Sequence, residues 1–216
     1  LGAVLAREKV TCLWLTAALF NHIVDAAPAI LAPVRHLLTG GETISTRHVR
    51  VALELLTGVR LINGYGPTET TTFATTCEIS RENCPTHHGS IPIGRPIANT
   101  RCLVLDGNRQ LVPIGAPGEL YIGGDGVGLG YLGDTERTAE KFVALPFGAS
   151  RDDRWYRTGD LVRWRSDGNL DYLGRMEPAI SRHGGFIDKY VGDAVMSLFI
   201  NASDGAVAAA IDMHRA

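Results

Sequence analysis

The sequence lacks several features that would point to particular classes of function. Its 216 residues carry 21 Lys and Arg against 23 Asp and Glu, a net charge of −2. That balance gives no electrostatic case for binding nucleic acid or an anionic membrane. No apolar run approaches the roughly 18 residues that a membrane-spanning helix needs. The first residues lack the pattern of a signal peptide, and the chain begins at Leu1 without a methionine, which favours a piece of a longer protein.

Cysteine is scarce and its spacing is uninformative. The four cysteines are Cys12, Cys77, Cys84 and Cys102. No two of them have the short paired spacing of a zinc site, and they do not suggest a disulfide scaffold. Reduced thiols in a cytoplasmic protein are the favoured interpretation.

The apolar pattern predicts an α/β protein. Hydrophobic residues make up 45% of the chain, as in ordinary globular proteins. Short apolar runs at 10–15 and 34–38 predict strands, and longer patterns at 16–27 and after Ser45 or Thr46 predict helices. This alternation predicts a parallel sheet. After Gly66 the apolar runs are short and bounded by Gly, Pro and Asp-Gly, which predicts an antiparallel, barrel-like region.

Residues 63–69, Asn-Gly-Tyr-Gly-Pro-Thr-Glu, place chemically useful groups on a predicted tight turn after a strand that ends at Ile62. The glycines on either side of Tyr65 leave room for a flat ligand against the ring. Thr68 offers a hydroxyl for a phosphate, and Glu69 offers a carboxylate for a divalent cation.

This heptapeptide resembles the nucleotide-binding motif of adenylate-forming enzymes, in particular the adenylation domains of nonribosomal peptide synthetases. Three further segments, 118–132, 156–161 and 167–175, are similar to later blocks of that family in the same order. The resemblance covers residues 1–175 and implies the C-terminal half of an adenylation-domain core. The implied fold is a parallel sheet with helices, followed by a distorted β-barrel-like region. Within these blocks Glu119 and Tyr131 are expected to be structural.

The resemblance implies a reaction that joins a carboxylate to the α-phosphate of ATP, with Mg²⁺ as cofactor. It assigns catalytic roles to Thr68, which would bond the α-phosphate, and to Glu69, which would help to hold Mg²⁺. The nucleotide-binding set is Gly41, Glu42, Tyr65, Asp160 and Arg175. In this set Tyr65 would stack on adenine and Asp160 would accept both ribose hydroxyls. Two alternatives stay open: Tyr65 as a half-buried core aromatic, and Asp160 as a turn cap.

The same resemblance assigns a substrate pocket for an amino-acid side chain. Its positions are Trp14, Leu38, Gly40, Gly64, Thr72 and Phe73. Large apolar groups narrow such a pocket while glycines leave space and offer no charge, which suits a small branched aliphatic side chain of valine type. For Leu38 and Phe73 an ordinary core role is a competing interpretation.

The residues after Arg175 depart from the family. Residues 176–216, with Phe-Ile-Asp-Lys-Tyr-Val-Gly-Asp at 186–193, resemble a fragment of a class III nucleotidyl cyclase of βαβ type. There Asp193, at the tip of a predicted hairpin, matches a metal-binding aspartate, and Lys189 matches a residue that reads the adenine base. The partner aspartate is absent, so an unliganded turn role for Asp193 is an equal alternative, and no cyclic nucleotide production is expected.

Essential parts of the adenylation machinery are missing from the sequence. The resemblance places the phosphate-gripping loop and the amino-group-binding aspartate before residue 1, and a cyclase-like tail stands where the catalytic lysine is expected. The predicted function is therefore ATP and AMP binding with valine-like activation, in a piece inactive by itself. Expected partners are the amino acid, ATP, the missing halves of either module, and a carrier domain whose phosphopantetheine lies outside this chain. The alternatives are a cyclase remnant and a non-catalytic rearrangement product.

Overall fold

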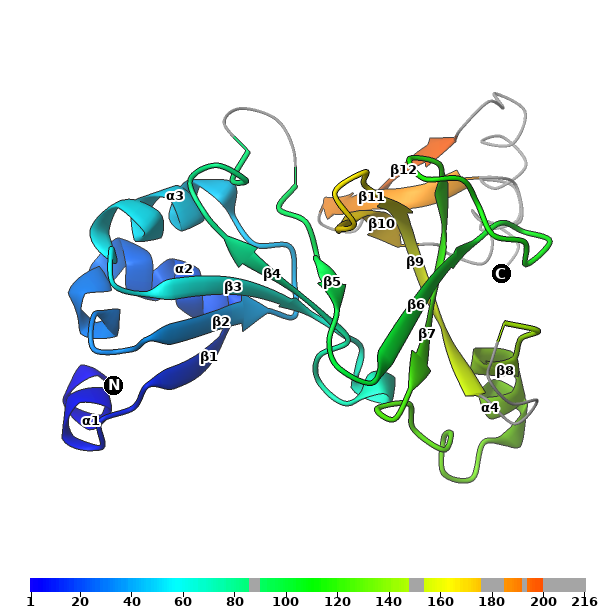
Figure 1. The fold of residues 1–216 in the computed structure, drawn as a ribbon, viewed down its shortest axis with the longest axis horizontal. Coiled ribbons are helices and arrows are strands. Elements are labelled where there is room, and N and C mark those ends of the chain that lie inside the picture. The colour runs from blue at the N-terminus through cyan, green and yellow to red at the C-terminus, as the bar shows by residue number, and fades with distance from the viewer. Residues whose placement is uncertain (86–89, 148–153, 176–184, 192–193, 200–216) are drawn as a thin grey trace. The chain divides into compact units, whose positions relative to one another are not determined.

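The computed structural model describes residues 1–85, 90–147, 154–175, 185–191 and 194–199, the last two ranges by their backbone alone (Figure 1). The chain divides into two compact units. The first contains residues 1–100 and 167–171, and the second contains residues 101–166 and those from 172 onward. This division differs from the predicted boundary at residue 175, which separates the segments that resemble two different families.

The first unit is built on a sheet of strand order β1-β2-β3-β4-β5. The strands are β1 (Cys12–Thr16), β2 (His36–Gly40), β3 (Arg60–Tyr65), β4 (Thr75–Ile79) and β5 (Arg95–Pro96). The first three are parallel, and β4 runs antiparallel to both β3 and β5. The strand and helix alternation thus predicted the parallel part of the sheet correctly.

Helices lie before, between and after the parallel strands. They are α1 (Gly2–Arg7), α2 (Ala17–Ala26), η1 (Pro28–Leu31), α3 (Thr46–Leu55) and η2 (Thr68–Thr70). Helix α2 begins where the Thr16 hydroxyl accepts a hydrogen bond from the Leu19 N–H at 3.3 Å, and Pro28 opens the next turn. Ser45 is the N-cap of α3, as predicted, although its side chain makes no capping hydrogen bond.

The two faces of this sheet differ because side chains alternate along each strand. Leu15, Leu37 and Leu61 are buried in one core cluster with Phe20 of α2 and Val49 of α3. The helices therefore cover the face that carries the odd-numbered residues of β1, β2 and β3. The other face carries Trp14, Leu38 and Ile62, which are aligned by register across the three strands. Trp14 is 46% exposed there.

The second unit is built on an antiparallel sheet of order β12-β11-β10-β9-β7-β6, with β8 paired to β9. Its elements are β6 (Thr100–Leu105), β7 (Pro117–Gly124), α4 (Thr135–Lys141), β8 (Phe142–Ala144), β9 (Arg154–Trp164), β10 (Leu170–Arg175), β11 (Gly185–Val191) and β12 (Ala194–Phe199). The predicted antiparallel region is confirmed. Residues 154–164 form one strand, β9, which pairs with β7 on both sides of a register shift between Glu119 and Tyr121.

The two Asp-Gly-Asn segments at 106–108 and 167–169 form turns. The Asp106 carboxylate accepts hydrogen bonds from the N–H groups of Asn108 and Gln110, both at 2.8 Å. The Asp167 carboxylate accepts one from the Asn169 N–H at 3.0 Å, and Gly168 between them has a φ of +81°. Aspartate side chains stabilise turns in this way, and glycine adopts a positive φ without strain.

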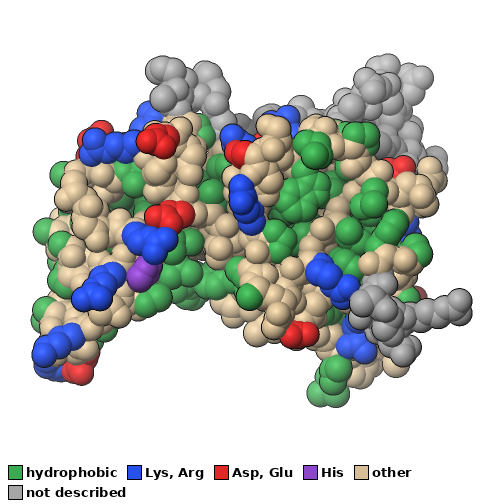
Figure 2. Space-filling model, viewed as in Figure 1, with side chains coloured by type: hydrophobic (Ala, Val, Ile, Leu, Met, Phe, Trp, Pro, Cys, Tyr) green, Lys and Arg blue, Asp and Glu red, His purple; other side chains and the backbone are tan. Residues whose placement is uncertain are grey.

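Charges of both signs are interspersed on the face drawn in Figure 2, where Lys and Arg lie among Asp and Glu. Arg60 of β3 and Glu78 of β4 form an exposed cross-strand pair, and Arg60 Nη1 lies 3.3 Å from His36 Nε2. Among the helices that the structure describes, none is long and apolar enough to cross a membrane.

Candidate active site

The predicted nucleotide motif spans the end of β3 and the turn after it. Asn63, Gly64 and Tyr65 are the last residues of β3, three positions beyond the predicted strand end. The strand continues because these residues pair with β2 on one side and with β4 on the other. The chain bends at Gly66 and Pro67, and Thr68 and Glu69 begin η2.

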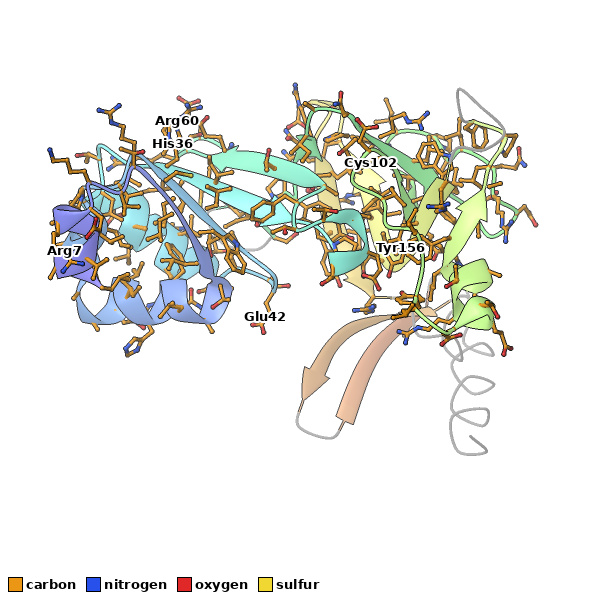
Figure 3. All side chains as sticks on the ribbon, turned by 90° about the horizontal axis from the view of Figure 1, so that it is seen from below. Arg7, His36, Glu42, Arg60, Cys102 and Tyr156 are labelled. Carbon is orange, nitrogen blue, oxygen red and sulfur yellow. The ribbon has the colours of Figure 1, made fainter. Side chains whose placement is uncertain are left out.

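The parallel register brings the first group of predicted residues to one edge of the sheet. Gly40 is paired with Gly64, so both strands end at the same level. Gly41 and Glu42 leave β2 at the edge where Tyr65 leaves β3. Figure 3 shows Glu42 beyond this end of β2, with His36 and Arg60 together at the opposite end. Ligands of open α/β sheets bind at the carboxyl ends of the strands.

The exposed groups at this edge suit a polar ligand. Gly41, Glu42 and Thr68 are exposed, while Tyr65 and Glu69 are partly exposed. Gly41 has a φ of +87°, and no atom lies within 4 Å of the position that a Cβ would take. An aromatic ring, a hydroxyl and two carboxylates are therefore accessible at this edge of the first unit, on the segments that follow β2 and end β3.

The turn after Pro67 folds back on the end of β3. The Tyr65 carbonyl accepts a hydrogen bond from the Ala74 N–H at 2.8 Å. A Cβ on Gly66 would lie 2.6 Å from the Ala74 nitrogen and 2.7 Å from the Thr72 oxygen. Backbone packing thus requires glycine at position 66. The sequence suggested only that this glycine allows a tight turn. Thr71 and Thr72 both have positive φ values, 60° and 69°, which no sequence signal indicated.

Three of the predicted pocket residues come together on the exposed sheet face. The rings of Trp14 and Phe73 meet edge to face, with centroids 6.3 Å apart and planes at 73°. Phe73 also covers Gly64, because a Cβ there would lie 2.7 Å from Phe73 Cδ1 and 3.1 Å from Cζ. Leu38, partly exposed, is aligned with Trp14 by register, and Thr72 is exposed in the turn.

The expectation that both glycines leave open space is corrected by this packing. A Cβ on Gly40 would lie closer than 3.0 Å to the Gly64 carbonyl oxygen, and the space beside Gly64 holds the Phe73 ring. Gly40 allows the backbone of β3 to approach closely, and Gly64 allows the Phe73 ring to do so. The sequence could not show this, because Phe73 reaches Gly64 only through the turn geometry.

A magnesium ion at this edge would depend on ligands from outside the protein. Within the described residues, no group of three or more His, Cys, Asp or Glu side chains is arranged to hold a metal. Glu69 supplies one partly exposed carboxylate. Mg²⁺ in nucleotide sites is often held by one or two carboxylates together with phosphate oxygens and water, so the residues fit a metal that arrives with a nucleotide.

Asp160 lies in the second unit, on a distorted part of β9. Its side chain is buried, with 9% of the residue exposed, and its N–H donates to the Thr158 hydroxyl at 2.9 Å. That hydroxyl donates to the Leu120 carbonyl at 2.8 Å. Gly159 has a φ of +75° where the β7–β9 register shifts. The distortion therefore fixes the backbone of Asp160.

Glu119 holds this distortion in place. Its carboxylate, in a residue only 7% exposed, accepts hydrogen bonds from Arg157 Nε at 2.9 and 3.0 Å and from the Gly159 N–H at 3.2 Å. It also accepts one from the Tyr121 hydroxyl at 3.3 Å. Burial raises the pKa of Tyr121, and the adjacent Glu119 carboxylate raises that pKa further. The structural role expected of Glu119 is thus confirmed, and it acts next to a predicted ligand-binding residue.

Two of the remaining predicted residues lie on strands β10 and β11. Arg175 is exposed at the end of β10, where its backbone pairs with Ile187 of β11. Lys189 is on β11 and its backbone is paired with Met196 of β12, which forms the predicted hairpin. Asp193 lies outside the described residues.

The fold and this site define the class of the protein, an α/β protein with polar groups gathered at the carboxyl edge of its parallel strands. A family model described as AMP-binding enzyme matches residues 1–132. The chain therefore belongs to the AMP-binding enzyme family.

Two curated proteins similar to this chain are named as synthases. Tyrocidine synthase 3 of Brevibacillus parabrevis is 42% identical over 208 residues, 96% of this chain and 3% of that protein. Bacitracin synthase 1 of Bacillus licheniformis is 44% identical over 184 residues, 85% of this chain and 3% of that protein. The chain thus spans only a small part of the curated relatives that it matches.

Solved structures show the same fold. PA1221, a nonribosomal peptide synthetase protein containing adenylation and PCP domains, matches with a TM-score of 0.75 and 40% identity, over 81% of this chain and 35% of that one. The N-terminal subdomain of Klebsiella oxytoca NpsA, in complex with 3-hydroxyanthranilyl-AMSN, matches with a TM-score of 0.74 and 28% identity, over 81% of this chain and 44% of that one. The fold class predicted from the sequence, part of an adenylation-domain core, is confirmed. Nothing in these comparisons supports a cyclase-like piece at residues 176–216.

Proposed function

We propose that this chain carries part of an adenylation site, which binds ATP or AMP together with a small branched aliphatic amino acid. Residues 1–175 are the adenylation part of this proposal. Residues 1–216 are not expected to complete the reaction by themselves, because the resemblance implies a phosphate-gripping loop and a catalytic lysine that are not among them. The stabilisation that this loop and this lysine would give to the transition state is therefore lacking in residues 1–216.

The observation that carries the proposal is the alignment of β2 and β3. The Gly40–Gly64 register places Glu42 and the motif from Tyr65 to Glu69 at one sheet edge, with their polar groups accessible. Flat aromatic rings, hydroxyls and carboxylates are the groups that bind a purine, a phosphate and a phosphate-bound cation. The same groups on unrelated surfaces could not serve one nucleotide.

Each residue then has a proposed role. The Tyr65 ring stacks on adenine, the Thr68 hydroxyl donates to an α-phosphate oxygen, and Glu69 helps to hold Mg²⁺. For Asp160 the resemblance implies that it accepts hydrogen bonds from the two ribose hydroxyls, a task that suits a carboxylate with two oxygens. Its fixed backbone supports this role, since a preset acceptor loses little freedom on binding. Arg175 contributes positive charge to the nucleotide.

The amino-acid side chain is proposed to contact Trp14, Leu38 and Phe73. These groups are apolar and carry no charge, so a charged substrate side chain would lose its hydration without gaining a partner. Valine fits the resemblance, and its discrimination from leucine or isoleucine rests on one methylene, worth about 1–3 kcal/mol.

A carrier domain is the proposed partner in the longer protein. The matched PA1221 structure contains adenylation and PCP domains in one protein. For this chain the equivalent acceptor, with its phosphopantetheine, would be a carrier domain outside residues 1–216. The alternatives, a cyclase remnant with Lys189 and Asp193 or a non-catalytic rearrangement product, have no observation in their favour.

Equilibrium dialysis with a labelled, non-hydrolysable valyl-AMP analogue tests the nucleotide role. Tyr65→Ala is expected to weaken binding roughly 5- to 150-fold, because a stacked base is worth about 1–3 kcal/mol. Tyr131→Ala is the matched control, since Tyr131 is a partly exposed tyrosine of the second unit whose ring stacks on Arg137. Equal losses in both variants, or no binding by the unmodified chain, would contradict the proposal.

Pyrophosphate exchange tests the proposed incompleteness separately. The purified chain is expected to show no valine-dependent exchange above a no-enzyme background. A clear signal from the chain without an added partner would show that it is a complete enzyme. Production of cyclic AMP, lost in Asp193→Ala, would instead favour the cyclase alternative.

A further inference from the structure

The turn at residues 71–73 has an unusual backbone. Thr71 has φ 60° and ψ 72°, and Thr72 has φ 69°, so two consecutive β-branched residues are left-handed. The Phe73 N–H donates to the Thr71 carbonyl at 2.9 Å, which closes a three-residue turn around Thr72. A γ-turn with a positive central φ is the rare and strained form, and threonine in this region of φ is an outlier.

The chain on both sides holds this turn in its strained state. Before it, the Thr71 N–H donates to the Thr68 carbonyl at 3.1 Å. After it, the Ala74 N–H donates to the Tyr65 carbonyl at 2.8 Å, and the close packing at Gly66 leaves no room for the backbone to move inward. Strained residues persist only where their surroundings determine them, and they cluster at sites that bind ligands.

The turn determines where the Phe73 ring lies. From this backbone position the ring rests on Gly64 and meets Trp14 edge to face. Threonine prefers other backbone regions, so the hydrogen bonds on both sides of the turn hold it left-handed and set the direction in which the chain enters Phe73. A glycine at the same place would allow many directions.

We propose that this strained turn is a positioning element that fixes the Phe73 ring against Gly64 and Trp14, and so sets the width of the amino-acid side-chain site. Thr71 acts through Phe73 and does not touch the substrate. The ligand in this inference rests on the proposed function, whereas the placement of the ring can be measured without any ligand.

The test compares Thr71→Gly with Thr57→Gly. Thr57 is an exposed threonine in the turn after α3, and its φ is not positive. Glycine at Thr57 is expected to raise the unfolding equilibrium constant about 2- to 5-fold, through the greater freedom of the unfolded chain. At Thr71 this effect is offset by relief of a left-handed penalty of roughly 5- to 30-fold. Thr71→Gly is therefore expected to be at least as stable as the unmodified chain.

Acrylamide quenching of Trp14 fluorescence reports the ring position. The contribution of Trp14 is obtained by subtracting the signal of the same protein with Trp14→Phe. Thr71→Gly is expected to increase Trp14 quenching, because a loosened Phe73 ring covers less of it, whereas Thr57→Gly leaves quenching unchanged. Thr71→Asn, which tolerates a positive φ and keeps a polar side chain, is expected to restore the lower quenching.

Ligand selectivity provides the second readout. Competition between valyl- and leucyl-AMP analogues is expected to show about 10- to 200-fold discrimination in the unmodified chain and markedly less in Thr71→Gly. Increased Trp14 quenching with lost discrimination supports the inference. Increased quenching without binding by any variant supports the ring placement and overturns the proposed function. Unchanged Trp14 quenching in Thr71→Gly overturns the inference, whatever the ligand results.

Discussion

The sharpest structural prediction concerns alanine substitutions at glycines around β2 and β3. In Gly40→Ala the new Cβ meets the carbonyl oxygen of Gly64, a backbone atom of the adjacent strand. That atom cannot move aside without separating β2 from β3 at their paired ends. In Gly58→Ala, by contrast, nothing lies within 4 Å of the new Cβ. The two substitutions are chemically identical, so the difference between them reports the local packing.

The expected magnitudes follow from these surroundings. Overpacking of this kind costs about 1–3 kcal/mol, whereas alanine in place of an unstrained, unhindered glycine stabilises by about 0.4–1 kcal/mol. The two variants should therefore differ by roughly 1.5–4 kcal/mol in unfolding free energy. For a unit of this size each kcal/mol shifts Tm by roughly 4–8 °C. Gly64→Ala should fall between them, because its obstacle is the Phe73 ring, which can rotate.

Thermal unfolding followed by circular dichroism, with urea titrations for the free energies, measures the series. A Gly40→Ala protein as stable as Gly58→Ala would refute the close approach of β2 and β3 at this level. A Gly64→Ala protein with unchanged Trp14 fluorescence would refute the contact between the Phe73 ring and the strand.

Three further outcomes are expected. Glu119→Gln should lower the unfolding free energy by about 1–3 kcal/mol, since hydrogen bonds to a charged group are lost at a buried site. The same variant should bind an adenosine ligand more weakly. Equal stability of the variant and the unmodified chain in urea would contradict the predicted loss. The hydrogen bond from His48 lowers the pKa of Asp25 below its ordinary 3.8. The stabilisation that this pair gives is therefore present above pH 3.8 and is lost as the pH falls through the lowered pKa. The Tm difference between Asp25→Asn and the unmodified chain at pH 6 should disappear in acid, and a constant difference would count against the pairing. Burial raises the pKa of Cys102 to about 12. At pH 8 iodoacetamide should therefore modify the exposed Cys12 much faster than Cys102 in a mass-spectrometric time course. Equal rates for the two thiols would refute the burial of Cys102.

Local patterns in the sequence identified the secondary structure and the motif. The apolar runs locate β1 and α2 within about two residues. The turn motifs at Asp106 and Asp167 were recognisable because an aspartate bonds to backbone only two residues away. Because such interactions join residues that are close in the chain, the residue types that form them occur at neighbouring positions of the sequence.

The sequence by itself determined the family, the α/β class and the candidate nucleotide residues from Tyr65 to Glu69, because these depend on short ordered segments. Only the tertiary structure decided that Phe73 fills the space beside Gly64, that the strain falls on Thr71 and Thr72, and that Glu119 fixes the strand at Asp160. Glu119 meets Arg157 across 38 positions of the chain. Contacts over such separations depend on how strands pair and bend, and no pattern among neighbouring residues encodes them.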